Sequence, residues 1–447
     1  MKEKNQWSSK FGFIMASAGA AVGLGAIWKF PYITGMSGGG AFFILFIIFT
    51  LLIGLPLLIS EYIIGRGAGA EAISAYKKLA PKTLWVWIGR FGVLGCFLLL
   101  SFYSVVGGWV VIYTGLSVSG NLLHASADYA DIFDKVTGSA GITILGLLLF
   151  SLINVIVIAL GVRNGIEKAN KYMMPLLFLF FIILVIRSVT LSGAMEGLKF
   201  FLAPDFSKIT RESLLYALGQ SFFALAVGFS CLVTYSSYLK KDVSLPFSAG
   251  WVVSMNIFVS LLSGLAIFPV VFAYGYQPTE GPGLLFMVLP AAFSQIPLGG
   301  VFLSLFLLLF LFATLTSSFS LYEIIVAAFT ANRFRSRKIV AWITGLIVFA
   351  AAIPAALSSS LLRDFKIFRK SVFDATDYLV SNLMLPIGCL LIAVFIIHKM
   401  DKALVREEFF LGGTAKASLF SLWRFLMTWI VPLTIVIVFL SMLGILK

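Results

Sequence analysis

The sequence predicts an all-α polytopic membrane protein with eleven transmembrane helices. Hydrophobic residues make up 60% of the 447 residues and charged residues only 12%, which is not the composition of a water-soluble domain of this length. A membrane-spanning helix needs roughly 20 mostly apolar residues. Eleven such stretches follow one another with short connectors, near residues 11–34, 40–65, 85–115, 141–160, 168–187, 214–238, 250–273, 300–330, 339–357, 376–398 and 421–445.

The positive charge is unevenly distributed over this topology. The net charge is +14, and placing the N-terminus inside assigns 22 Lys or Arg residues to the inner side, 10 to the outer side and Lys29 to the first span. This asymmetry follows the positive-inside rule, so we expect a cytoplasmic N-terminus and, with eleven spans, an external C-terminus. No basic patch is interleaved with aromatic residues, and we therefore expect no nucleic-acid partner.

The first and the sixth stretch are interrupted by glycine. Gly19, Gly23 and Gly25 fall in AGAAVGLGAIWKFPY, and Gly228 falls in QSFFALAVGFSCLVTY. The two stretches open two five-span halves, so the interruptions take corresponding positions, as in inverted-repeat transporters whose site lies between broken helices. We predict one domain over 1–447, with repeat one at about 8–190, repeat two at about 212–400 and an extra span at about 421–446. Glycines that only permit close helix packing are the alternative.

A broken helix in a membrane has a specific chemical consequence. Each freed backbone amide or carbonyl costs several kcal/mol in hydrocarbon unless another group binds it. A cation on the carbonyls and an anionic group on the amides meet that need, and the helix dipoles assist. We expect no enzyme, because the sequence has no nucleophile and base pair and no phosphate-binding loop.

Several segments resemble the neurotransmitter:sodium symporter family. They are GFIMASAGAAVGLGAIWKFPY, SGGGAFFILF, GLPLLISEYIIGR, LSFYSVVGGW, GIEKANKYMMP, FLAPDFSKI, FFALAVGFSCLVTYSSY, FATLTSSFSLYE and VFDATDYLVSN, in the family's order and over about nine tenths of the chain. The resemblance implies the leucine-transporter fold, with broken spans 1 and 6 and a central site, and a multi-pass protein of the bacterial inner membrane.

The resemblance also implies two sodium sites of unequal quality. The second site has all of its matching residues, which are Gly19, Val22, Ala313, Thr316 and Ser317. The first site is degraded, since its positions are occupied by Ala21, Ala26, Ala224 and Asn256, with methyl groups where the family usually has oxygen-bearing side chains. We therefore expect one sodium ion per cycle, through the second site. We expect no chloride, because the family's chloride ligands in spans 2 and 6 match Phe46 and Ala224, and the carboxylate of chloride-independent members matches Ser260.

The substrate site that the resemblance implies is mostly apolar. Its residues are Ala21, Leu24, Gly25, Leu99, Tyr103, Phe223, Ala224, Ala226, Phe229, Ser317 and Leu321. Backbone amides at Leu24 and Gly25 and the hydroxyl of Tyr103 would receive a carboxylate, and carbonyls of spans 1 and 6 an ammonium group. Gly23 replaces the Asp of monoamine carriers, which favours an amino acid with an apolar side chain.

Ion pairs and aromatic residues match the gates of the family. Lys29 and Asp377 match the outer ion pair beside the site. Lys4 and Trp7 resemble the N-terminal latch on the inner side, but the Asp that usually receives it is Ala331 here, so we expect the inner side to close through other contacts.

Three further features leave alternatives open. Gly165 and Pro175 have the spacing with which some members unwind span 5 and admit water to the second sodium, although a helix start and an ordinary kink explain the same pair.

Glu61 and Glu323 lie inside apolar spans, where a carboxylate is costly unless paired or protonated. We interpret both as structural or gating groups, with proton coupling as the alternative.

Together these features predict sodium-coupled uptake of a small hydrophobic amino acid by alternating access. A proton-coupled or sodium-independent carrier of a related small solute is one alternative. A nutrient sensor that keeps the fold and binds its ligand without net transport is another. The sequence does not name the amino acid or the oligomeric state.

Overall fold

The computed structural model describes residues 6–123, 128–277, 283–331, 336–413 and 415–442, and these residues fold into helices without a β-strand. Nine helices in this part of the chain are long and apolar enough to cross a membrane. They are Gly40–Ala68 (α3 and α4), Val86–Val118 (α6), Ala140–Ala159 (α8), Val162–Val189 (containing α9), Leu245–Ala273 (α13), Gly299–Thr330 (α15), Arg337–Ser359 (containing α16), Val372–His398 (α17 and α18) and Ala417–Ser441 (α20 and α21).

Two more spans are broken, as predicted. Span 1 consists of α1, Lys10–Ala21, and a second helix over Gly25–Met36 that is bent from it by 50°. Span 6 consists of α11, Arg211–Phe223, and α12, Cys231–Ser236, separated by seven residues that are not helical. The bent pair counts as a tenth span, whereas the seven residues between α11 and α12 separate them too far for the pair to be counted as one. Nine or ten of the eleven predicted spans are therefore confirmed by length and composition within the described residues. Span boundaries otherwise agree with the predicted ones to within a few residues.

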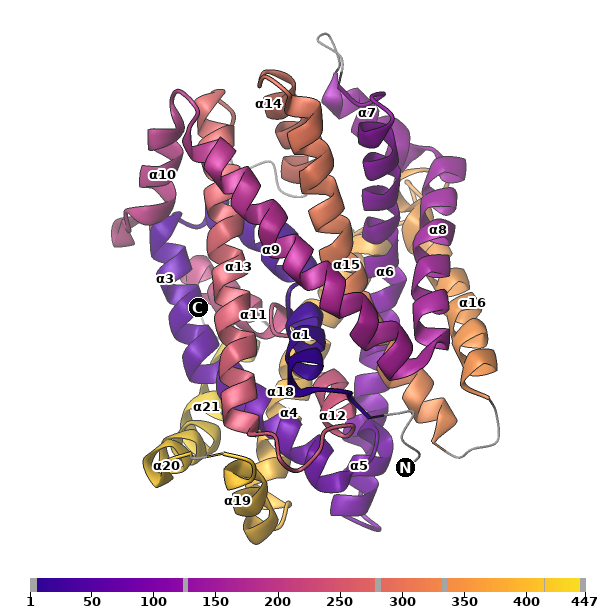
Figure 1. Ribbon diagram of the computed structural model, residues 1–447, viewed down its shortest axis with the longest axis vertical. Coiled ribbons are helices and arrows are strands. Elements are labelled where there is room, and N and C mark those ends of the chain that lie inside the picture. Colours follow the sequence, from indigo (N-terminus) through magenta and orange to yellow (C-terminus); the bar gives the residue numbers. More distant parts are fainter. Residues whose placement is uncertain (1–5, 124–127, 278–282, 332–335, 414, 443–447) are drawn as a thin grey trace.

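Short helices cover the two ends of the molecule. Tyr129–Gly138 (α7), Ala194–Leu202 (α10) and Leu289–Ser294 (α14) lie together at one end, which we call the α10 end, and Ala72–Leu79 (α5) and Lys402–Phe410 (α19) lie at the other, which we call the α19 end (Figure 1). The helix α14 comes from the apolar segment GLLFMVLPAAF, which is too short to cross the membrane. It follows a π-helical turn at Leu284–Val288 and forms part of the cover at the α10 end.

The helix boundaries follow from capping side chains. Ser9 accepts a hydrogen bond from the amide of Gly12 at the start of α1, and Thr210 and Ser213 form a reciprocal capping box at the start of α11. The first helix of each broken span, α1 or α11, therefore begins at a defined residue. Their opposite ends are defined by tertiary contacts instead.

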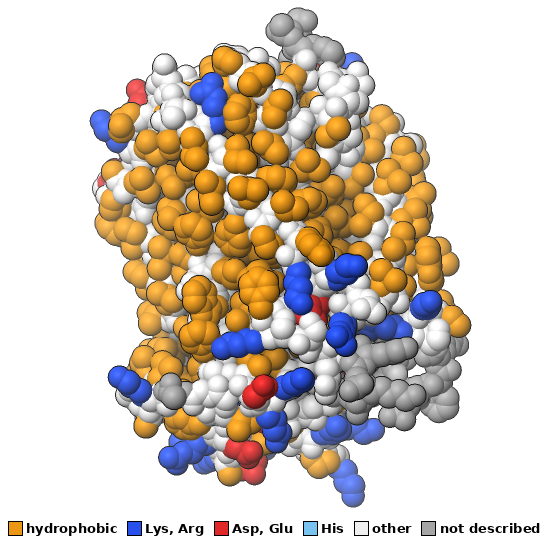
Figure 2. All heavy atoms as spheres, viewed as in Figure 1, with side chains coloured by type: hydrophobic (Ala, Val, Ile, Leu, Met, Phe, Trp, Pro, Cys, Tyr) orange, Lys and Arg blue, Asp and Glu red, His pale blue; other side chains and the backbone are white. Residues whose placement is uncertain are grey.

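The broken helices lie in the middle of the molecule and the intact ones surround them. Figure 1 shows α1, α11 and α12 near the centre, between α6, α8 and α16 on one side and α3, α10 and α13 on the other. Apolar side chains such as Leu179, Ile182 and Ile186 of α9 are exposed on the outside. Figure 2 shows a broad band of hydrophobic side chains on this face of the molecule. Lys and Arg side chains gather below that band toward the α19 end (Figure 2). This surface is that of a chain whose solvent is a lipid bilayer.

Candidate functional site

The break in span 1 is centred on Val22 and Gly23. The amide of Val22 still donates to the carbonyl of Ala18 at 2.7 Å, and beyond Gly23 the helix resumes as a π-helical turn, Gly25–Lys29. A Cβ atom on Gly23 would lie 2.1 Å from Oγ of Ser317 and 2.9 Å from the hydroxyl of Tyr103. A side chain at this position would therefore require Ser317 and Tyr103 to move.

The break in span 6 is held open by a carboxylate. Ala226, Gly228 and Ser230 have positive φ angles of 52°, 103° and 60°, a region that non-glycine residues rarely adopt. Glu61 of α4, which is fully buried, accepts hydrogen bonds from the amide of Gly228 at 2.7 Å and the amide of Leu232 at 3.1 Å. The carboxylate therefore binds amides that the break leaves without helical partners.

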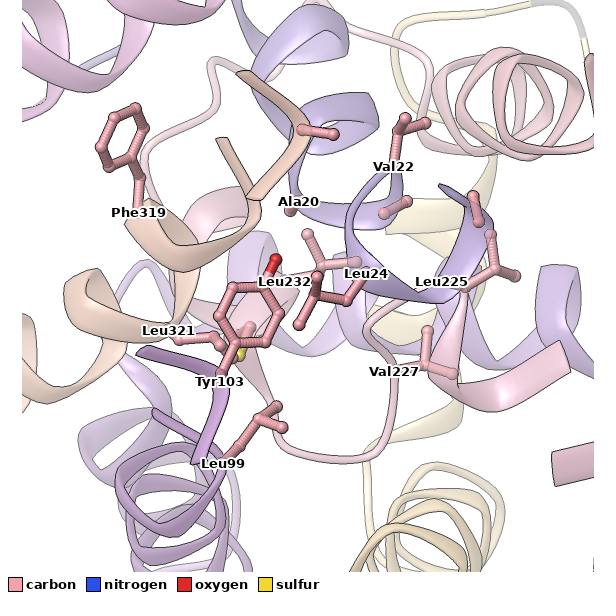
Figure 3. Close-up of a cluster of buried hydrophobic side chains, with 14 of the residues drawn as sticks. Ala20, Val22, Leu24, Leu99, Tyr103, Leu225, Val227, Leu232, Phe319 and Leu321 are labelled. Carbon is pink, nitrogen blue, oxygen red and sulfur yellow. The ribbon is translucent and has the colours of Figure 1, made fainter. Parts of the chain in front are cut away.

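A small cavity of about 30 Å³ lies where the two breaks face each other. Ten of the eleven residues predicted for the substrate site line it, and Ala224 is the one that does not. In Figure 3 the side chains of Leu24, Leu99, Tyr103 and Leu321 converge beside the break of span 1. The full lining is Ala20, Ala21, Gly23, Leu24, Gly25, Leu99, Tyr103, Phe223, Ala226, Phe229, Ser317, Ser320, Leu321 and Leu385.

The lining includes four residues that were not among the predicted ones. Ser320 lies one helical turn from Ser317 on α15, and Ala20 and Gly23 flank predicted residues, so helical and local spacing could have found them. Leu385 comes from the start of α18, and only tertiary packing brings it to the cavity. Because no lining side chain carries a charge, a charged ligand would meet backbone groups and the hydroxyls of Tyr103, Ser317 and Ser320.

The predicted outer ion pair forms next to the cavity. Nζ of Lys29 lies 2.8 Å from Oδ1 of Asp377 and donates to Oγ of Ser381 at 3.1 Å. The same ammonium group lies 4.3 Å from the centre of the Phe223 ring, within cation–π range. Span 1, span 6 and span 10 thus meet above the cavity on its α10 side.

The residues predicted for the second sodium site come together between α1 and α15. Oγ of Ser317 donates to the carbonyls of Gly19 and Ala20, both at 2.9 Å, and Oγ1 of Thr316 donates to the carbonyl of Ala313 at 3.1 Å. Gly19 packs so closely that a Cβ atom on it would lie 2.9 Å from Cβ of Thr316. The region supplies hydroxyl and carbonyl oxygens without a carboxylate, and Val22 and Ala313 are fully buried beside it. This donor set fits a small monovalent cation.

Asn256 contacts both breaks at the positions that match the first sodium site. Nδ2 of Asn256 donates to the carbonyl of Ala21 at 3.1 Å and to the carbonyl of Ala224 at 2.9 Å. Its Oδ1 is buried and has no hydrogen-bond partner among the described residues. Ala26 and Ala224 contribute only methyl groups, and both are fully buried.

Gln220 links the two broken spans and was not predicted. Its Nε2 donates to the carbonyl of Gly25 at 2.6 Å, from α11 to span 1. No motif in the sequence marks Gln220, because its partner is a backbone atom of a distant segment.

At the α19 end the N-terminal segment is tied to span 5 by Glu167. This carboxylate is buried, accepts hydrogen bonds from the amide and hydroxyl of Ser8 at 2.8 and 2.5 Å, and pairs with Lys171 at 3.1 Å. Nε1 of Trp7 donates to the carbonyl of Tyr235 at 2.8 Å. The predicted latch residue Lys4 lies outside the described residues. Ser8 and Glu167 therefore make a closing contact that the sequence reasoning missed.

A second buried carboxylate, Glu323 of α15, has a cationic partner. Both Nη atoms of Arg337 bind it, Nη1 at 2.9 Å to Oε1, and the hydroxyl of Tyr238 donates to Oε1 at 2.9 Å. Glu323 is fully buried, whereas 18% of the Arg337 side chain is exposed. Spans 6, 8 and 9 are therefore joined at the α19 end.

The predicted unwinding pair lies in continuous helix in this structure. Gly165 is in the π-helical turn Val162–Glu167, where a Cβ atom would lie 2.0 Å from the carbonyl oxygen of Val157. Pro175 lies within α9, Lys168–Val189. Unwinding between them remains a prediction for another conformation.

A helical membrane protein whose two broken spans line a small cavity has the architecture of a membrane transporter. The family model of the "Sodium:neurotransmitter symporter family" matches residues 4–139 and 129–446. The chain is 51% identical over 443 residues to the sodium-dependent transporter YhdH of Bacillus subtilis, covering 99% of this chain and 98% of the relative. A sodium-dependent transporter of Haemophilus influenzae is 38% identical over 98% of both chains.

The solved structures agree with the family match. The crystal structure of MhsT in complex with L-phenylalanine superposes with a TM-score of 0.91 at 39% identity, covering 98% of this chain and 99% of that one. The chain belongs to the sodium:neurotransmitter symporter family. It has the fold of MhsT and is a transporter, not an enzyme.

The contact between Ser8 and Glu167 gives a first prediction. Replacing Glu167 with Ala removes the acceptor of two hydrogen bonds from Ser8, so the start of α1 should open more often. We expect amide hydrogen exchange over residues 8–13 to accelerate about tenfold, which corresponds to about 1.4 kcal/mol of local opening free energy. Lys171→Ala is the comparison variant, because it removes a partly exposed partner of Glu167 and of the Ser8 hydroxyl but leaves both bonds from Ser8 to Glu167. Equal exchange in wild type and Glu167→Ala would show that the contact does not hold the segment.

Proposed function

We propose that this protein takes up a small hydrophobic amino acid with one sodium ion per cycle, bound at the second site, and without chloride. The observation that carries the proposal is the uncharged cavity between the two breaks, next to a cluster of carbonyl and hydroxyl oxygens shared by α1 and α15. The lining matches the chemistry of a zwitterion, because backbone groups at helix breaks can receive its two charges and apolar side chains can surround the rest. The similarity to MhsT, whose structure contains L-phenylalanine, supports an amino acid with an apolar side chain.

The contacts of Asn256 support a single sodium ion. Its NH₂ group donates to the carbonyls of Ala21 and Ala224, so one carbonyl at each break already has a neutral hydrogen-bond donor. A cation at that place would have to displace the amide and would find methyl groups at Ala26 and Ala224. The residues at the family's chloride-binding positions support chloride independence. These residues are Phe46 and Ala224, and neither has a hydroxyl with which to bind an anion.

The partners of Glu323 favour sodium over protons as the coupling ion. Glu323 binds the guanidinium of Arg337 and the hydroxyl of Tyr238, so it is satisfied as an anion. Glu61 binds two backbone amides of span 6 and has no cationic partner among the described residues. Proton-coupled transport and ligand sensing without transport are the competing functions.

We place the protein in the bacterial inner membrane, with the α19 end in the cytoplasm. The concentration of Lys and Arg toward that end supports this orientation (Figure 2). The N-terminus is then cytoplasmic and the C-terminus external.

Uptake of radiolabelled amino acids into proteoliposomes tests the proposal. We expect accumulation driven by an inward sodium gradient, a Hill coefficient for sodium of about 1, and no change when gluconate replaces chloride. Choline in place of sodium should abolish uptake. Uptake driven by a proton gradient without sodium would contradict the proposal, as would a Hill coefficient near 2. Sodium-dependent ligand binding without accumulation would identify a sensor.

A further inference from the structure

Asn170, on α9 of span 5, is a buried side chain with one unused oxygen. It has no exposed surface, and its Nδ2 donates to the carbonyl of Ile166 one turn earlier at 2.8 Å. That bond determines which way the amide faces. Its Oδ1 is buried and has no hydrogen-bond partner among the described residues.

The free oxygen lies against Gly19, one of the residues predicted for the second sodium site. A Cβ atom built on Gly19 would lie 2.1 Å from Oδ1 of Asn170 and 2.9 Å from Cβ of Thr316. The amide oxygen and the Thr316 side chain thus flank the same glycine, whose carbonyl accepts a hydrogen bond from Ser317. Span 5 therefore contributes a polar atom to a site that the family resemblance builds from spans 1 and 8 alone.

An oxygen of this kind needs a partner. A buried acceptor without a hydrogen bond costs about 1–3 kcal/mol, and the described residues around Asn170 offer no donor to it. An amide carbonyl oxygen is a hard, neutral ligand of the type that small hard cations prefer. A cation held by the carbonyl of Gly19 and the hydroxyl of Thr316 would satisfy it.

We propose that Oδ1 of Asn170 is a further ligand of the sodium ion at the second site. The inference rests on the proposed function, since it assumes that this site binds the coupling ion. Sodium would then hold span 5 against spans 1 and 8 as well as holding those two together.

The position of Asn170 gives this ligand a role in ion release. It lies between Gly165 and Pro175, the two residues predicted to bound an unwinding segment, and three residues after Glu167, which binds the N-terminal segment. Unwinding of this segment would break the bond from Nδ2 to the carbonyl of Ile166 and withdraw Oδ1 from the ion. Loss of one ligand and opening of the path to the α19 end would then be the same event.

Two substitutions separate a ligand from a structural residue. Asn170→Asp keeps an oxygen at the site but removes the NH₂ donor to Ile166, whereas Asn170→Ala removes both. Asn154 of α8 is a matched control, because it is equally buried and makes the same type of bond to Phe150 at 2.9 Å, but its Oδ1 already accepts a hydrogen bond from Ser318.

The measurement is the sodium concentration that half-maximally raises the melting temperature of the purified protein, with choline chloride keeping the ionic strength constant. We expect Asn170→Ala to raise this concentration about tenfold or more, a loss of about 1.4 kcal/mol, and Asn170→Asp to leave it unchanged or lower it. Asn154→Ala should lower the melting temperature without changing the sodium dependence.

The outcomes separate the inference from the function. If both Asn170 variants lose sodium affinity equally, the residue acts through its bond to Ile166, and the inference is wrong. If Asn170→Ala titrates like wild type, the oxygen is not a ligand. If the wild-type protein shows no sodium-dependent stabilisation at all, the proposed function itself fails.

Discussion

Replacing Thr316 and Ser317 together with Ala should abolish sodium-driven uptake and raise the half-maximal sodium concentration for thermal stabilisation by on the order of 100-fold or more. Ser317 donates to the carbonyls of Gly19 and Ala20 on α1. Cβ of Thr316 lies beside Gly19, and the Thr316 hydroxyl donates to the carbonyl of Ala313. The double variant removes every side-chain hydroxyl that the predicted second site contains. The ion would keep only carbonyl oxygens and the amide oxygen of Asn170.

The variant should fold, because these hydroxyls add little to the stability of α15. Thr316 bonds within its own helix, and Ala has a higher helix propensity than Ser or Thr. Ser318→Ala is the control, since it removes a neighbouring buried hydroxyl whose partner, Asn154, lies outside the site. Retained uptake with an unchanged sodium dependence in the double variant would exclude this region as the coupling site.

Replacing Arg337 with Ala should destabilise the protein by about 3–5 kcal/mol, the usual cost of leaving one partner of a buried ion pair uncompensated. Glu323 is fully buried and would keep only the hydroxyl of Tyr238 as a partner. The contact also joins α15 to α16 and span 6 at the α19 end, so its loss should favour opening there. Thermal unfolding measures the first effect, and hydrogen exchange of α12 measures the second.

A second substitution distinguishes the ion pair from simple packing. Adding Glu323→Gln to Arg337→Ala removes the buried charge and keeps a side chain that Tyr238 can bind. The double variant should therefore recover part of the lost stability. Arg337→Lys should be intermediate, because an ammonium group cannot reproduce the paired bonds of the guanidinium. If the double variant is no more stable than Arg337→Ala, the carboxylate charge is not what the arginine compensates.

The spans and both breaks could be predicted from the sequence because hydrocarbon imposes a simple rule on it. Every segment that crosses a bilayer must be apolar and helical, and a helix can open only where other groups bind its backbone. The apolar stretches therefore gave the boundaries of the long helices to within a few residues, and the glycines marked the breaks. The cavity lining followed from the family's motifs, as ten of its residues show.

Contacts between distant segments were decided by the tertiary structure. Whether Asn256 faces an ion or bridges two carbonyls depends on where spans 1, 6 and 7 lie, and nothing in its neighbours along the chain records that. The same holds for Glu167 as the partner of Ser8 and for Leu385 at the cavity.

Asn170 shows this division most clearly. The sequence places it on an apolar span, where an amide side chain can form several kinds of hydrogen bond. One of them is the bond to the backbone of its own helix that Asn170 makes. Only the packing of α9 against Gly19 leaves its oxygen buried and unpaired beside a residue predicted for the second sodium site. Composition and motif determined what kind of protein this is, because the bilayer acts on each segment alone. The atoms that meet at the ion were decided by packing, because a coordination shell is built from several segments at once.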